Sequence, residues 1–280
     1  MVHAKDKPLG DDVDLRQIAQ TTAGFTGADL ENLLNEAAID AAKEGRPYIM
    51  QKDIKKAFIK VGIGAEKKSK VISDKEKKIT AYHEAGHAIL FHVLPHMDPV
   101  YTISIIPTGM GAAGYTMPLP DNDEMFNTKN KMLEDITTLL GGRVAEEIIF
   151  GDITTGASND IKRATETARS MVMKYGMSEK IGLIAYGNDD DEVFIGRDLA
   201  HTRGYSEEVA REIDGEISRI IVSAMRMQRA SSVRISAFFT AVRPFFSRRK
   251  RYIVKSSKHF LQQKKKRLQK QTNKMHKKTY

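Results

Sequence analysis

The sequence has no cysteine and no tryptophan among its 280 residues. Without cysteine there can be no disulfide framework and no thiolate metal site, so a metal ion would have to be held by His, Asp or Glu. No apolar run approaches the roughly 20 residues that span a bilayer, and no signal peptide opens the chain. We therefore expect the chain alone to be soluble and cytoplasmic, with enough length for two ordinary domains.

Acidic side chains are absent from one end of the chain. Residues 226–280 contain 18 Lys and Arg and no Asp or Glu, so the other 27 basic and all 36 acidic side chains lie in the first 225 residues. The overall charge of +9 therefore combines a body of net charge −9 with a strongly basic tail. Such an asymmetry is typical of an arm that binds nucleic acid or an acidic membrane.

A shift of reading frame explains this tail better than an evolved arm does. Codons compatible with Met225 to Phe239, read one base earlier, spell YENAESILRENISVL, which continues the apolar helical spacing that precedes it. Runs such as Phe238-Phe239 are also less typical of basic arms. We predict that residues 226–280 are a frameshift product, are disordered and have no specific nucleic-acid partner.

The most informative motif is His83-Glu84-Ala85-Gly86-His87, an HExxH pentapeptide. Residues four apart lie on one face of a helix, so both imidazoles can reach a single metal ion. Glu84 would then be close enough to act on a water molecule at the metal. This pattern is typical of zinc hydrolases, most often peptidases.

The surroundings of the pentapeptide favour zinc over a histidine-rich helix without metal. Ser73 and Glu76 form a predicted capping box, and Pro95 closes the segment. Between them Ile79, Tyr82, Gly86, Ile89, Leu90 and Val93 recur at helical spacing. Because this apolar stripe includes the histidine face, both imidazoles would be buried at a cost unless a metal or hydrogen bonds satisfied them.

The remaining pattern predicts a mainly α fold, of the α+β class, with one small sheet. Helices are predicted after the Thr26 cap, near 51–62, over 127–149, from the turn at 154–161 to about Lys174, and at 207–225. Alternating residues predict strands at 100–106 and 114–117. An extended peptide substrate could add to the edge of such strands, although a purely structural hairpin fits equally well.

Charge and pattern divide the chain into four segments. Residues 1–63 form a helical unit, residues 64–72 a charged linker, residues 73–225 the domain with the HExxH helix, and residues 226–280 the basic tail.

A catalytic zinc usually takes three protein ligands, and spacing alone leaves the third one open. Glu146 and Glu147 lie on a predicted downstream helix, as is common in HExxH peptidases. Asp160 lies at a helix start after a Gly-Ala-Ser turn. Each candidate also has an ordinary structural explanation, since Asp160 could only cap its helix and the glutamates could form a solvated face.

The strings FTGADLENLLNEAA, AYHEAGHA, GGRVAEEIIFG, TTGASNDI and EVFIGRD, in this order, resemble the FtsH family of membrane-anchored AAA+ zinc proteases. The resemblance runs from about residue 2 to residue 225. It implies that residues 1–63 are the AAA+ helical lid and residues 73–225 an M41 zinc peptidase domain. It also implies that Asp160 completes a Zn²⁺ site with His83 and His87, and that Glu84 is the catalytic base.

The resemblance further implies an endopeptidase that cleaves unfolded or membrane-extracted proteins. In the family this activity belongs to a homo-hexamer on the cytoplasmic face of the cell membrane. The chain departs from the family in having no GxxxxGK[ST] phosphate loop and no membrane helices, so ATP and Mg²⁺ are implied only for a full-length protein. We therefore interpret the chain as a fragment, lid plus peptidase. The alternative is a catalytically dead fragment that binds nucleic acid or joins hexamers.

Overall fold

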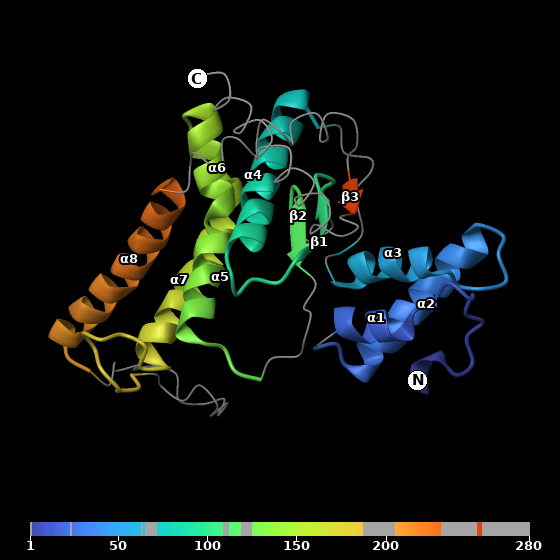
Figure 1. Cartoon of the computed structure of the whole chain (residues 1–280), viewed down its shortest axis with the longest axis horizontal. Coiled ribbons are helices and arrows are strands. Elements are labelled where there is room, and N and C mark those ends of the chain that lie inside the picture. Colours follow the sequence, from blue (N-terminus) through green and yellow to red (C-terminus); the bar gives the residue numbers. More distant parts are fainter. Residues whose placement is uncertain are drawn as a thin grey trace, which may run out of the picture. The chain divides into compact units, whose positions relative to one another are not determined.

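The computed structural model describes residues 2–22, 24–62, 64, 72–108, 112–118, 125–186, 205–230 and 251–253. The chain divides into two compact units. One is built from Met1–Lys77, Asp98–Asp123 and Phe246–Tyr280, and the other from Lys78–Met97 and Glu124–Phe245. Figure 1 labels their helices and strands. Among the described residues, no helix combines the length and the apolarity needed to cross a membrane.

The first unit begins with helices η1 (Val2–Ala4), α1 (Leu15–Thr21), α2 (Gly27–Lys43) and α3 (Gln51–Gly62). Thr26 and Asp29 form the predicted capping box of α2, each side chain accepting a hydrogen bond from the other's backbone N–H. The predicted helices α2 and α3 are confirmed, whereas α1 was not predicted. Their apolar faces share one core, made of Ile18, Leu33, Leu34, Ala37, Ile49, Ile54 and Ala57.

The same unit contains a three-stranded antiparallel sheet, of order β2-β1-β3. Its strands are β1 (Val100–Ser104), β2 (Tyr115–Pro118) and β3 (Arg251–Ile253). The two predicted strands are confirmed in position, and β1 ends at Ser104, two residues before the predicted end. Strand β3 was not predicted, because it lies in the basic tail.

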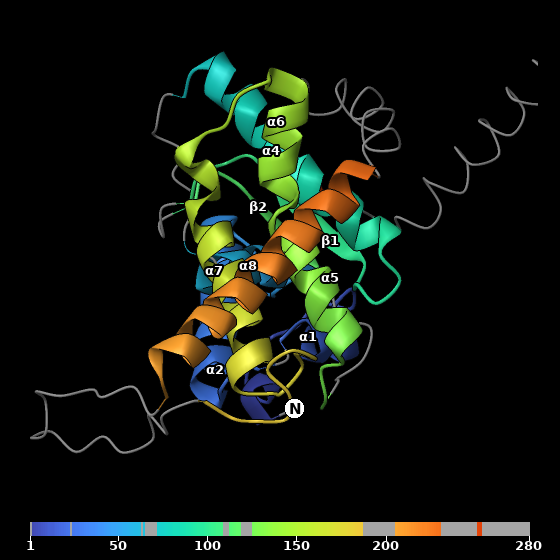
Figure 2. The ribbon, with the colours of Figure 1, turned by 90° about the vertical axis from the view of Figure 1, so that its left-hand side faces the viewer.

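The second unit is helical and contains the histidine motif. Its elements are α4 (Asp74–Val93, of which the first four residues belong to the first unit), α5 (Lys129–Leu139), α6 (Gly141–Phe150), η2 (Thr155–Ala157), α7 (Ser158–Met173) and α8 (Glu207–Ala230). Helix α8 lies across α5 and α7 (Figure 2), and these three helices enclose the core. The core residues are Met132, Ile136, Leu140, Ala164, Ala168, Met171, Val172, Ile181, Ile213, Ile217, Ile220 and Ala224.

Helix α4 confirms the predicted histidine helix. Ser73 and Glu76 exchange the hydrogen bonds of a capping box, each backbone N–H donating over 3.2 Å to the other's side chain. Residues 83–90 are all buried, so the helix is enclosed on every side over its two central turns. Only the predicted end of the apolar stripe is wrong, because Val93 is 45% exposed.

The predicted helix over 127–149 is two helices. Helix α5 ends at Leu139 and α6 begins at Gly141, with Leu140 serving as C-cap of the first and N-cap of the second. Two glycines follow Leu140, and glycine weakens a helix because it has the most backbone freedom to lose. Helix α6 lies against α4, where the backbones of Gly86 and Gly141 meet.

The domain boundaries drawn from the sequence stay predictions. The sheet groups by proximity with the first unit, although the sequence assigned it to the domain with the HExxH helix. Helix α8 continues to Ala230, five residues beyond the predicted start of the tail. Apart from strand β3, the remainder of the tail lies outside the described residues, as do most of the linker and the EVFIGRD string.

Candidate metal centre

Three predicted ligands lie together in the second unit. His83 and His87 project from neighbouring turns of α4, with ring centroids 4.8 Å apart and the rings inclined by 75°. Asp160 is the third residue of α7, and its Oδ2 lies 3.2 Å from His83 Nε2 and 3.7 Å from His87 Nε2. One ligand atom from each residue lies within 4.8 Å of the other two, and no other such cluster occurs in the part of the chain that the structure describes.

The outer nitrogen of each imidazole is held by a hydrogen-bond acceptor. His87 Nδ1 lies 2.8 Å from the carbonyl oxygen of Thr138, and His83 Nδ1 lies 2.8 Å from Glu146 Oε1. A carbonyl or carboxylate oxygen only accepts, so both Nδ1 atoms donate N–H. In the neutral imidazoles the lone pairs then reside on Nε2, the two atoms that face Asp160.

The surroundings of His83 are rich in negative charge. Burial alone would lower its pKa, but hydrogen bonds with Asp160 and Glu146 and the charge of Glu84 outweigh burial and raise the pKa of His83 to about 10. Burial lowers the pKa of the neighbouring His87. Because a metal-ligating histidine must be neutral, a cation bound here would displace the proton that this negative charge favours.

The donor set fits zinc. Two imidazole nitrogens and one carboxylate oxygen are ligands that Zn²⁺ takes in catalytic sites, where a fourth position stays open. His83 and His87 are buried and Asp160 is half-buried, so little water would compete for the ligands. Each imidazole also has the hydrogen-bonded outer nitrogen that is usual for a metal-ligating histidine.

The glutamates that were candidates for the third ligand occupy other positions. Glu146 is 1% exposed and lies on the outer side of His83, where its Oε2 also accepts the backbone N–H of Thr154 over 2.7 Å. Burial would raise the pKa of Glu146, but these hydrogen bonds keep it below its usual value. Glu147, the next residue, is half-buried and does not belong to the cluster.

Glu84, the predicted base, is 5% exposed and follows His83 on α4. Its charge contributes to the raised pKa of His83, which places the carboxylate within electrostatic reach of the cluster.

Sequence reasoning missed the Thr138 carbonyl altogether, because a backbone acceptor leaves no mark in the residue pattern. It did single out Glu146, but as a ligand rather than as the support of His83.

Known proteins match the chain over most of its length. Residues 70–234 match the profile of Peptidase family M41, and residues 12–56 match the AAA+ lid domain. The chain belongs to peptidase family M41. The M41 match extends nine residues beyond Met225, where the resemblance was predicted to stop.

Curated relatives carry the name ATP-dependent zinc metalloprotease FtsH. The protein of Caldicellulosiruptor bescii is 58% identical over 225 residues, covering 80% of this chain and 36% of the relative. The protein of Thermotoga maritima is 53% identical over 222 residues, covering 79% and 36%. The chain thus spans about a third of the length of these relatives. The comparisons do not support the alternative of a dead fragment that binds nucleic acid or joins hexamers.

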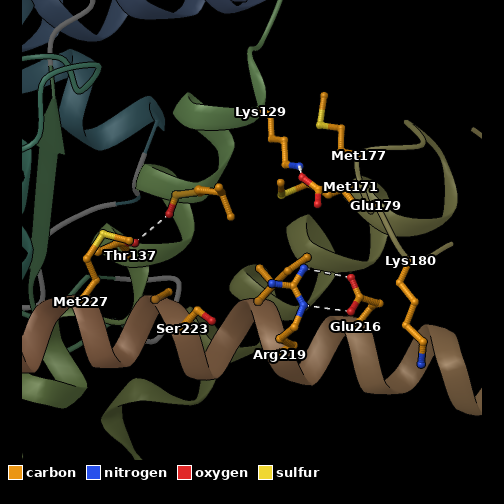
Figure 3. Close-up of a pocket in the computed structure, with 13 residues that line it drawn as sticks. Lys129, Thr137, Met171, Met177, Glu179, Lys180, Glu216, Arg219, Ser223 and Met227 are labelled. Atoms are coloured by element: carbon orange, nitrogen blue, oxygen red, sulfur yellow. Dashed lines mark hydrogen bonds and ion pairs between the residues drawn. The ribbon is translucent and has the colours of Figure 1, made fainter. Parts of the chain in front are cut away.

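A cavity of about 360 Å³ lies elsewhere in the second unit, between α5, α7 and α8 (Figure 3). Its floor is apolar and includes Met171 and Ile220, while ion pairs such as Glu216 with Arg219 lie at its edge. None of its lining residues belongs to the metal cluster.

Proposed function

We propose that this chain supplies the proteolytic part of an ATP-driven, membrane-anchored protease, and that it hydrolyses peptide bonds with a zinc ion held by His83, His87 and Asp160. One observation carries the proposal. The Nε2 atoms of two buried histidines converge on Oδ2 of Asp160, while both Nδ1 atoms are engaged by acceptors that fix the tautomer required for metal binding.

Each side chain of the centre has a distinct task in this proposal. Zinc bound there would supply Lewis acidity, which polarises a peptide carbonyl and lowers the pKa of water towards about 7. The carboxylate of Glu84 accepts the proton of the attacking water and passes it to the leaving amine. Glu146 and the Thr138 carbonyl keep the two imidazoles in one orientation and one tautomer.

The substrates and the assembly that we infer follow from the family rather than from the geometry of the metal centre. We infer that substrates are unfolded or membrane-extracted polypeptides, because a chain must lie extended for a peptide bond to reach a buried centre. We also infer that a full-length protein works as a homo-hexamer at the cytoplasmic face of the cell membrane. There it would use ATP and Mg²⁺ at a phosphate loop that this sequence does not contain.

Cleavage of casein by the 280-residue chain in the presence of zinc tests the proposal. Glu84→Gln should reduce the rate by about 10²- to 10⁴-fold, the usual contribution of a general base, while zinc content stays unchanged. Glu166→Gln, an exposed glutamate of α7, is the matched control and should cleave at the wild-type rate. Wild-type cleavage by Glu84→Gln would remove the assigned base, and rapid degradation of a stably folded substrate would contradict the substrate class.

A further inference from the structure

Helices α4 and α6 approach each other closely because glycines line their contact. A Cβ added to Gly86 would lie 2.4 Å from the carbonyl oxygen of Gly141. A Cβ added to Gly141 would lie 2.7 Å from Leu90 Cδ1 and 2.9 Å from the carbonyl oxygen of Gly86. Carbon atoms do not approach this closely without displacement, so neither position accepts a side chain at the observed helix separation.

The next residue, Gly142, makes a contact of a different kind. A Cβ added there would have the ring of His83 as its nearest neighbour, at 2.4 Å from Cε1, 2.4 Å from Nε2 and 2.6 Å from Cδ2. Such similar distances to three adjacent ring atoms place this carbon over the face of the imidazole, because a carbon in the ring plane beyond Nε2 would be clearly nearer to Nε2. The side-chain position of Gly142 therefore points at the ring face, at its metal-facing edge.

His83 is thus held on three sides, by two residues of α6 and by one residue in the first turn of α7. Glu146 binds Nδ1, Asp160 lies 3.2 Å from Nε2, and Gly142 lies against the face. The hydrogen bonds fix the direction of the ring edge, but they do not prevent the ring from shifting along its own normal. The contact with Gly142 opposes that shift on its side.

We propose that Gly142 is a positioning residue, which keeps His83 Nε2 aimed at the point shared with His87 and Asp160. A methyl group at this position would displace the ring and separate Nε2 from the other two ligand atoms. Metal geometry tolerates only small errors in ligand position, so the consequence is a loss of metal affinity. This inference rests on the zinc site proposed above.

Zinc affinity, measured by competition with a chromogenic chelator, gives the first test on the full 280-residue chain. Gly142→Ala should bind zinc roughly tenfold to hundredfold more weakly than the wild type, as is typical when the support of a ligand is lost. Gly215→Ala is the matched control, because the same methyl group enters open space on α8 and should leave zinc affinity unchanged. Wild-type affinity in Gly142→Ala would overturn the proposal.

A double-mutant cycle without metal tests whether the methyl group added at Gly142 acts through the ring of His83, and the result does not depend on zinc. In excess chelator, Gly142→Ala should lower the melting temperature in the wild-type background but not in the His83→Ala background, where the ring that it meets is gone. Recovery of folding by the double variant would support the proposal even if Gly142→Ala alone did not fold. An equal decrease in both backgrounds would overturn it, because the methyl group would then be meeting something other than His83.

The two measurements also distinguish this proposal from the zinc site on which it rests. A wild-type chain that binds no zinc would end the proposed function, whereas the metal-free cycle would still report whether Gly142 sets the position of His83.

Discussion

Buried carboxylates have different partners in the two units. In the first unit Asp53 is 2% exposed, and its two oxygens accept hydrogen bonds of 2.8 Å from the two terminal nitrogens of Arg46. In the second unit Glu146 is buried to the same degree, but its partner is the imidazole of His83. One carboxylate therefore faces a permanent cation, and the other faces a group that is cationic only when protonated.

The difference separates a structural ion pair from a centre that favours an added cation. Burial would raise the pKa of Asp53, but hydrogen bonds from Arg46 and from the Met50 N–H hold it below its usual range. Its charge is fully compensated within the chain. Around His83 lie the carboxylates of Glu84, Glu146 and Asp160, whose negative charge a divalent metal would offset.

The largest effect is expected from breaking the compensated pair. Arg46→Met leaves Asp53 buried and unpaired, which should lower the free energy of unfolding of the first unit by about 3–5 kcal/mol. The chain has no tryptophan whose fluorescence could follow unfolding, so amide hydrogen exchange in α2 and α3 is a suitable measurement. Lys52→Met removes an exposed cation that pairs with Glu44 and should cost less than about 1 kcal/mol. Equal losses of unfolding free energy in the two variants would contradict the claim that burial makes the Arg46–Asp53 pair more important for stability than the exposed pair.

The next effect concerns the support of His83. Glu146→Gln keeps an acceptor for Nδ1–H but removes the negative charge, so zinc affinity should fall by roughly tenfold to hundredfold. Glu147→Gln, its neighbour on α6, should keep the wild-type affinity, and chelator competition measures both. A larger loss of zinc affinity in the Glu147 variant than in the Glu146 variant would contradict the assignment of Glu146 as the support of His83.

Local patterns predicted most of the helices, since capping residues and apolar spacing act over a few residues. Ser73 with Glu76 and Thr26 with Asp29 are the clearest cases. The break at Leu140 escaped prediction because the apolar spacing continues through it, although Gly141 and Gly142, which follow, weaken a helix at this point.

The centre was predictable to the extent that its residues are close in sequence or carried by the family motifs. His83 and His87 lie one helical turn apart, so spacing alone placed them together. Asp160 is 77 residues from His83, and spacing could not choose it over Glu146. The Thr138 carbonyl and the Gly142 contact depend on how α5 and α6 pack against α4, which no local pattern encodes.

A structural ion pair in the second unit tests whether the behaviour of a buried carboxylate depends on its partner rather than on the unit in which it lies. Glu216 accepts hydrogen bonds from Arg219 and Ser178, and these bonds, with the positive charges of Arg219 and Lys180, outweigh burial and lower the pKa of Glu216 to about 2. Because this pKa lies below the unfolded value of 4.5, the stabilisation is complete above about pH 4.5 and is lost as the pH falls towards 2.

Glu216→Gln should therefore destabilise the second unit by about 1–2 kcal/mol at pH 7. The difference from the wild type should shrink between pH 4.5 and 2 in urea denaturation followed by circular dichroism. A difference that is independent of pH would contradict the assignment.

The smallest effect is expected at the surface of α7. Lys162 lies 3.9 Å from Glu166, one turn away, and both side chains are more than half exposed. Lys162→Ala should change the free energy of unfolding by at most about 0.5 kcal/mol, since the solvent screens the pair and alanine favours the helix. Zinc content should not change, although Lys162 is only two residues from Asp160. A loss of zinc would show that charge near the centre matters beyond its ligands.

Zinc content of the purified, folded chain tests the central claim most directly. After incubation with excess zinc and removal of free metal, the wild type and Glu147→Ala should each retain one zinc ion per chain, and Asp160→Ala should retain almost none. A folded wild type without zinc, or an Asp160→Ala variant that retains it fully, would contradict the centre described here.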